Sequence, residues 1–223
     1  MKTNTLLLSY IGFCLIYLLI ILLGMEDVAW FLKPFLLPFL LFGVYFHHDF
    51  PSKKFLLTAL TFSWIGDIIL LFAERGELFF ISGLIAFLIS HLVYILLFNK
   101  QLKDRNKKNK AVYWIGVTVI IAYLFVMLTI LLPSLGDLQL PVLVYAIVLS
   151  TMLLFAFKGF LSWKEPANSY VLLGAIIFVS SDSILAFDKF HEPIAMSSFL
   201  IMVTYLTAQF LIVKGILKLN QKK

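Results

Sequence analysis

The chain carries eight apolar stretches, each about as long as a membrane-spanning helix, separated by short polar breaks. A helix rises about 1.5 Å per residue, so about 20 apolar residues cross the hydrocarbon core of a bilayer. Apolar residues make up 62% of the chain and charged residues only 13%, against about 45–50% and about 25% in soluble domains. We therefore expect an all-α membrane protein, a bundle of eight transmembrane helices forming a single domain over residues 1–223. The expected helices are 5–24, 29–46, 54–73, 78–98, 111–132, 138–157, 168–187 and 194–217.

The basic residues fall mainly on one side of this bundle. Of the 18 lysines and arginines, 15 lie at one set of helix ends, Arg75 and Lys189 lie at the other, and Lys33 lies near the second side. Basic loops remain in the cytoplasm. The pattern predicts a multi-pass protein of a bacterial cytoplasmic membrane with both termini inside. It also explains the net charge of +6 by topology, so we expect membrane lipids and no nucleic acid as partners.

The basic run at 100–110 is the densest group of charges. We interpret it as a cytoplasmic loop that fixes topology. The alternative is a site for anionic lipid head groups, to which each base near the surface contributes about 1 kcal/mol. The single cysteine, Cys14, excludes a disulfide framework within the chain.

Two aspartates, Asp67 and Asp182, lie inside the apolar stretches. A carboxylate in hydrocarbon costs about 2.5–3.5 kcal/mol on insertion scales, so an intramembrane acid indicates a functional site. Their surroundings are similar: residues 66–72 read Gly-Asp-Ile-Ile-Leu-Leu-Phe, and residues 181–187 read Ser-Asp-Ser-Ile-Leu-Ala-Phe. They lie in the third and seventh expected helices, which run in the same direction, 13 and 14 residues after the starts of those helices, so both acids lie at similar depth. This predicts two parallel four-helix repeats with a site between them; the alternative is a chance match between leucine-rich helices.

Several other polar side chains occur inside the expected helices and are candidates for substrate binding. For each of them, ordinary packing between helices is the alternative. His91 should lie roughly 10 Å deeper than Asp67 if the helices are straight, so its contact with the acids is an open question. The candidates are Lys33, His91, Tyr94, Tyr145, Ser181, Tyr205 and Gln209.

The residues favour acid–base chemistry over the other kinds. The sequence contains no Gly-x-Ser-x-Gly, no His-Glu-x-x-His, no phosphate loop and no dinucleotide fingerprint. Two carboxyls in one cavity titrate apart and leave one acid and one base, which suits a reaction that passes through an oxocarbenium ion. The rivals are a proton-coupled or cation transporter using the same acids, a metal-dependent lipid amide or ester hydrolase with Asp67, Asp182 and His91 as ligands, and a lipid-binding scaffold.

At these residues the chain resembles the lysoplasmalogenase family of multi-pass membrane proteins, also called YhhN-like, and the resemblance covers nearly the whole chain. It is carried by motifs that occur in order along six of the expected helices. They are Lys33-Pro34, Gly66-Asp67, Gly83-x-x-x-Phe87-x-x-x-His91-x-x-Tyr94, Tyr145 with Met152, Gly174-x-x-x-Phe178-x-x-Ser181-Asp182, and Tyr205-x-x-Ala208-Gln209.

The resemblance implies hydrolysis of the vinyl ether bond of lysoplasmalogens, which are lysophospholipids, with release of a fatty aldehyde and a glycerophospho head group. It implies no organic cofactor, and we expect no metal. Asp67 and Asp182 would be the catalytic pair, one as proton donor and one as ionised partner. Lys33 would meet the phosphate, and the remaining polar candidates would position the glycerol hydroxyl or water.

Overall fold

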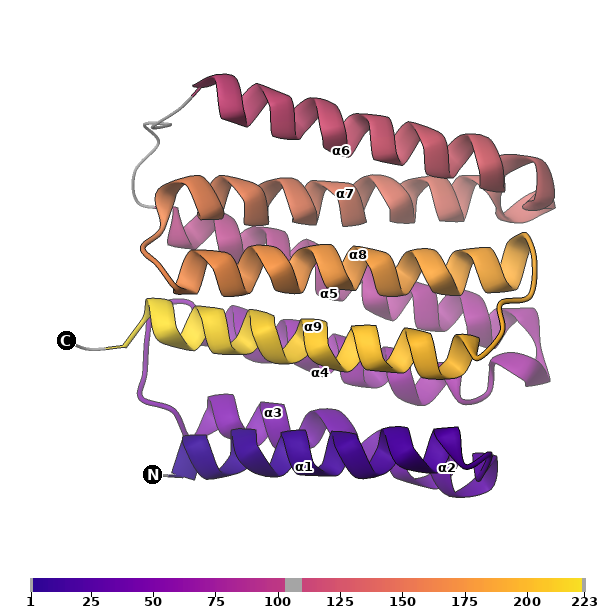
Figure 1. The fold of residues 1–223 in the computed structure, drawn as a ribbon, viewed down its shortest axis with the longest axis horizontal. Coiled ribbons are helices and arrows are strands. Elements are labelled where there is room, and N and C mark those ends of the chain that lie inside the picture. Colours follow the sequence, from indigo (N-terminus) through magenta and orange to yellow (C-terminus); the bar gives the residue numbers. More distant parts are fainter. Residues whose placement is uncertain (1, 103–109, 222–223) are drawn as a thin grey trace. The chain divides into compact units, whose positions relative to one another are not determined.

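The structure, a computed structural model, describes residues 2–102 and 110–221 and builds them from α-helices joined by short turns and 3-10 segments (Figure 1). Most of the basic run at 100–110, namely residues 103–109, lies outside the described residues. The chain divides into two compact units, residues 1–97 and residues 98–223, and each is described by itself.

The first unit contains α1 (Lys2–Leu22), α2 (Glu26–Leu32), α3 (Leu36–Tyr45), α4 (Lys53–Leu70) and most of α5 (Glu77–Gln101). Helix α3 packs against α1 and α4. The start of α1 and the α3–α4 connection lie at one end of this unit, and the α1–α2 and α4–α5 connections lie at the other (Figure 1).

The helix expected at 29–46 is broken into α2, a 3-10 turn (Lys33–Phe35) and α3. The prolines explain the break. Pro34 begins the turn, and Pro38 has no N–H to donate to the carbonyl four residues earlier, which is that of Pro34. Trp64 of α4 supplies a donor instead, because its Nε1 lies 2.7 Å from the Pro34 oxygen. This hydrogen bond fastens α4 to the break, one residue from Lys33.

The second unit contains α6 (Lys110–Leu131), α7 (Gln139–Ser162), α8 (Ala167–Phe190) and α9 (Ser197–Leu219). These helices lie side by side in chain order and alternate in direction (Figure 1). The α6–α7 and α8–α9 connections lie at one end, and the α7–α8 connection and the end of α9 lie at the other.

Seven segments of the described chain are long and apolar enough to cross a membrane, so the chain is an integral multi-pass membrane protein. Helix α4 is not among the seven, and it carries Lys53, Lys54 and Asp67 within 18 residues. The eighth span therefore stays a prediction, as does the single domain. The division between residues 97 and 98 falls inside α5, at the end of the fourth expected span, and the parallel repeat stays a prediction.

Helices α8 and α9 approach closely because glycines face the partner helix. A Cβ added at Gly174 would lie 2.8 Å from Ile212 Cγ1 and 3.0 Å from the Ala208 oxygen. A Cβ added at Gly215 would lie 3.0 Å from the Ala167 oxygen. Small residues permit such contacts in membranes, where association depends on close packing between backbones. This contact holds α8, the helix of Asp182, in place.

We expect Gly174→Ala to destabilise the protein by about 1–3 kcal/mol, because the new methyl meets backbone atoms that cannot move aside separately. Gly12→Ala is the matched control, since nothing lies within 4 Å of a Cβ at Gly12. Alanine there should be neutral or stabilise α1 by about 0.5–1 kcal/mol. Thermal unfolding in detergent micelles measures both. Equal midpoints for the two variants would contradict the packing described here.

Candidate functional site

The Asp182 carboxyl in α8 is held by a tyrosine of the neighbouring helix. Tyr145 of α7 donates a hydrogen bond from its hydroxyl to Asp182 Oδ2 at 2.6 Å. Both side chains are partly buried within the second unit. This hydrogen bond fixes the orientation of the carboxyl. Two of the expected site residues are thereby brought together.

The residues beside Asp182 bind the helices on both sides of α8. The hydroxyl of Ser183 is hydrogen-bonded to that of Tyr123 in α6. The hydroxyl of Ser181 donates to the Ile201 oxygen in α9 at 2.9 Å. Asp182 therefore sits on a section of α8 that is tied by side chains to α6, α7 and α9.

Two further expected site residues lie buried in α9. Tyr205 packs edge-on against Phe178 of α8, with ring centroids 5.6 Å apart. Gln209, one turn later, is fully buried. Tyr205 faces α8, because its ring contacts Phe178. Gln209 lies four residues later and therefore on the same face of α9.

The Asp67 carboxyl in α4 is 3% exposed and lies in the first unit. It is within electrostatic range of Lys33 at the helix break and of Tyr10 and Tyr17 in α1. Both tyrosines are buried. Of the expected residues, Lys33 and Asp67 are thus neighbours, as a role for both in one site requires. Gly66, beside the acid, lets the ring of Phe87 in α5 lie against α4, since an added Cβ would be 2.6 Å from it.

A pair of serines joins α4 and α5 by a polar contact one turn before Asp67. Ser63 Oγ and Ser90 Oγ lie 2.8 Å apart, and Ser90 also donates to the Ala59 oxygen at 2.8 Å. His91 follows Ser90 and is fully buried, as is Tyr94.

Comparison with known proteins decides the family. Residues 28–216 match the model described as the YhhN family. The chain belongs to this family. It is 29% identical to lysoplasmalogenase TMEM86A of Bos taurus over 76% of its length and 68% of the relative. It is 30% identical to lysoplasmalogenase TMEM86B of Homo sapiens over 72% of its length and 62% of the relative. It is also 30% identical to human lysoplasmalogenase TMEM86A over 73% of its length and 65% of the relative.

The chain thus spans about two thirds of the length of these relatives. No solved structure matches it. All nine expected site residues fall inside the segment that matches the YhhN family.

The structure places four further residues near the two acids, and the sequence analysis missed all four. They are Tyr10 and Tyr17 near Asp67, and Tyr123 and Ser183 near Asp182. Tyr10 and Tyr17 lie seven residues apart with Cys14 between them, which places all three on one face of α1. That spacing was a usable signal, although it lies before the segment that matches the YhhN family. Tyr123 stands among apolar residues and gives no such signal.

Neither unit, in its described residues, brings together three His, Cys, Asp or Glu side chains in a group suited to a metal ion. The polar groups around each acid are instead hydroxyls and, near Asp67, one lysine. In both units this arrangement suits proton transfer and hydrogen bonding.

Proposed function

We propose that this YhhN-family protein is a membrane hydrolase that cleaves the vinyl ether bond of lysoplasmalogens. The observation that carries the proposal is its kinship with relatives named lysoplasmalogenase, at about 30% identity over about three quarters of the chain. The substrate class is an alkenyl lysophospholipid with an ethanolamine or choline head group. Each unit carries an intramembrane carboxyl with hydroxyl neighbours, buried at Asp67 and partly buried at Asp182, and this supports the assignment.

The chemistry needs an acid, a base and one water. A protonated aspartate donates its proton to the β-carbon of the alkenyl group, and the double-bond electrons form the new C–H bond. The adjacent carbon becomes an oxocarbenium ion, which the second, ionised aspartate stabilises. Water adds to that carbon and gives a proton to the ionised aspartate. The hemiacetal hydroxyl gives its proton to the aspartate that acted as donor in the first step, and its oxygen forms the carbonyl. The bond to the glycerol oxygen breaks, and that oxygen takes the proton held by the other aspartate and leaves as an alcohol. The fatty aldehyde is released, and both aspartates return to their starting states.

The two aspartates are the proposed catalytic residues, and their meeting in one cavity is part of the proposal. Tyr145 positions the Asp182 carboxyl through its hydrogen bond. Lys33, close to Asp67, binds the phosphate of the head group. His91, Tyr94, Ser181, Tyr205 and Gln209 hold the glycerol hydroxyl or the attacking water. The chain requires no organic cofactor or metal for these steps.

We also infer that the chain crosses a bacterial cytoplasmic membrane eight times with both termini in the cytoplasm. Within the second unit, Lys158, Lys164, Lys214 and Lys218 belong to the end that carries the α7–α8 connection, and Lys189 belongs to the other. The positive-inside rule then places the first of these ends in the cytoplasm. Cysteine labelling of single-cysteine variants at both helix ends tests this orientation.

The deciding experiment measures aldehyde release by the purified protein from an alkenyl lysolipid and from its saturated alkyl analogue. Only the alkenyl compound can be protonated at carbon, so it alone should yield aldehyde. Release from neither compound overturns the proposed function. Uptake of an unchanged solute by proteoliposomes, with no aldehyde formed, would identify a transporter instead.

Tyr145→Phe should lower the turnover of the alkenyl lysolipid by about 10- to 100-fold. The variant removes the hydrogen bond to Asp182 Oδ2, so the carboxyl loses its fixed orientation. Misplacement of a reacting group by about 1 Å can cost about 100-fold in rate. Tyr170→Phe, also in the second unit, is the control. It makes the same chemical change at a tyrosine whose ring lies 4.8 Å from the Lys214 ammonium, and phenylalanine keeps that ring. Equal turnover of both variants would remove Tyr145 from the site.

A further inference from the structure

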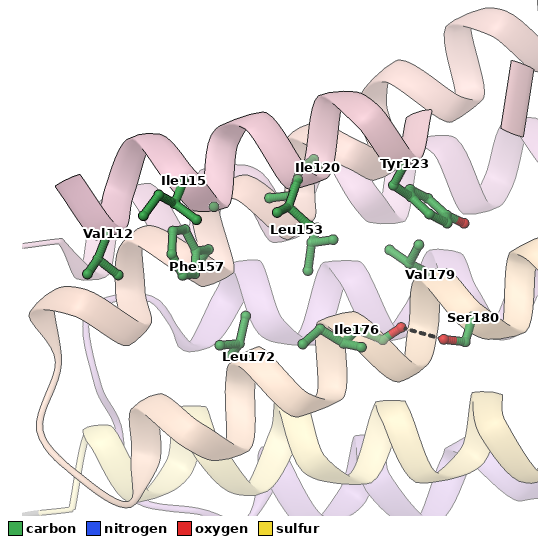
Figure 2. Close-up of a pocket in the computed structure, with 12 residues that line it drawn as sticks. Val112, Ile115, Ile120, Tyr123, Leu153, Phe157, Leu172, Ile176, Val179 and Ser180 are labelled. Atoms are coloured by element: carbon green, nitrogen blue, oxygen red, sulfur yellow. Dashed lines mark hydrogen bonds between the residues drawn. The ribbon is translucent and has the colours of Figure 1, made fainter. Parts of the chain in front are cut away.

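The second unit contains an apolar groove of about 580 Å³ between α6, α7 and α8 (Figure 2). Val112 and Leu172 line one end, Leu153 and Ile176 line the middle, and Tyr123 lies at the other end. From Val112 to Tyr123 the groove follows about three turns of α6, or roughly 16 Å. Its volume is within the range of about 300–1,000 Å³ that is usual for small-molecule sites.

Polarity is confined to one end of this groove. Its lining is hydrocarbon except for Tyr123 and Ser180, which both lie on the side of the groove away from Val112 (Figure 2). The Tyr123 hydroxyl is hydrogen-bonded to Ser183, the residue that follows Asp182. Asp182 in turn accepts the hydrogen bond from Tyr145. Tyr123, at one end of the groove, is therefore hydrogen-bonded to the residue next to the carboxyl of the candidate site.

We propose that this groove binds the single hydrocarbon chain of the lysolipid substrate. The methyl end of the chain lies near Val112 and Leu172, and the ether end lies at Tyr123, beside Asp182. This assignment rests on the proposed function, which supplies a one-chain lipid whose reacting bond joins the chain to a polar head. The groove matches that lipid in shape and in the order of its apolar and polar parts.

The groove determines where the hydrocarbon chain of the substrate lies more than how tightly the substrate binds. Lipid tails are as apolar as leucine, so a chain that leaves the bilayer for the groove gains little hydrophobic free energy. What the groove supplies is a fixed distance between the seated chain and the carboxyl at its polar end, because misplacement of reacting atoms by about 1 Å can cost about 100-fold in rate. Shortening the groove should therefore change which chain lengths react.

The first test is Leu172→Trp, which fills the far end of the groove. We expect turnover of a hexadecenyl lysolipid to fall by about 10- to 100-fold, while turnover of an octenyl lysolipid stays at the wild-type level. Leu173→Trp is the matched control, because Leu173 is the next residue of α8, is 50% exposed and does not line the groove. If wild-type protein releases aldehyde and Leu172→Trp keeps the wild-type chain-length profile, the groove assignment fails and the proposed function stands.

The second test needs no turnover. A saturated alkyl lysolipid with a diazirine at the end of its chain is photolysed with the wild-type protein, and the labelled residues are mapped by mass spectrometry. We expect labels at Val112, Ile115 or Leu172, displaced by unlabelled lysolipid and not by two-chain phosphatidylcholine. Labels elsewhere, or equal displacement by both lipids, overturn the assignment and identify an ordinary membrane lipid as the occupant. Correct labelling by a protein that releases no aldehyde would instead refute the proposed hydrolysis.

Discussion

Replacing Asp182 by Asn is expected to lower aldehyde release from an alkenyl lysolipid by about 100- to 10,000-fold, the usual contribution of a general acid or base. Asparagine keeps the shape of the side chain and can still accept a hydrogen bond from Tyr145, but it cannot give or take a proton at the pH of the assay. The loss should therefore appear in kcat, with the thermal midpoint in detergent close to that of wild type.

Asp137→Asn provides the control for this variant. It makes the same chemical change at an exposed aspartate of the 3-10 turn (Gly136–Leu138) that precedes α7, at the very start of a candidate span. We expect wild-type turnover from it. A turnover of Asp182→Asn near that of Asp137→Asn would remove Asp182 from the mechanism and would leave its contact with Tyr145 a structural one.

Asp67→Asn should cause a loss of similar size, because the reaction needs both a proton donor and an ionised partner in the same turnover. The side chain is buried in the first unit beside Lys33, Tyr10 and Tyr17. Asp27→Asn is the control, since Asp27 is exposed at the start of α2. Aldehyde release per milligram of monodisperse protein, with the alkyl analogue as blank, measures both.

The double variant gives the sharpest test of the pair. Groups that act as one unit show strongly non-additive losses. Asp67→Asn with Asp182→Asn should therefore be no worse than the poorer single variant by more than a few-fold. Losses that multiply would mean that the two carboxyls act independently, and the proposed joint mechanism would be wrong.

The helices themselves followed closely from the sequence. Helices α5, α6 and α8 lie within a few residues of the stretches expected at 78–98, 111–132 and 168–187. Length and hydrophobicity define such segments, since a bilayer admits only helices of about this size. The break at Lys33 was missed because apolarity continues across it, whereas the interruption depends on which N–H groups the prolines remove.

The site was harder to predict than the helices. A polar side chain inside an apolar span is visible in the sequence, which is why Asp182 and Tyr145 were both among the expected residues. Their hydrogen bond depends on how α7 and α8 are rotated about their axes. In a soluble helix the apolar stripe reveals that rotation, but a helix that is apolar on every side has no such stripe. Tyr123 was missed for the same reason.

The contact between Trp64 and Pro34 has a consequence for the first unit. Water is absent from the core of a bilayer, so a carbonyl that loses its helical partner there must find a donor within the protein, at a cost of several kcal/mol if it finds none. The indole of Trp64 provides that donor at 2.7 Å. A tryptophan thus takes over the task that solvent performs in soluble proteins, and a bent segment next to a lysine becomes tolerable inside a lipid environment.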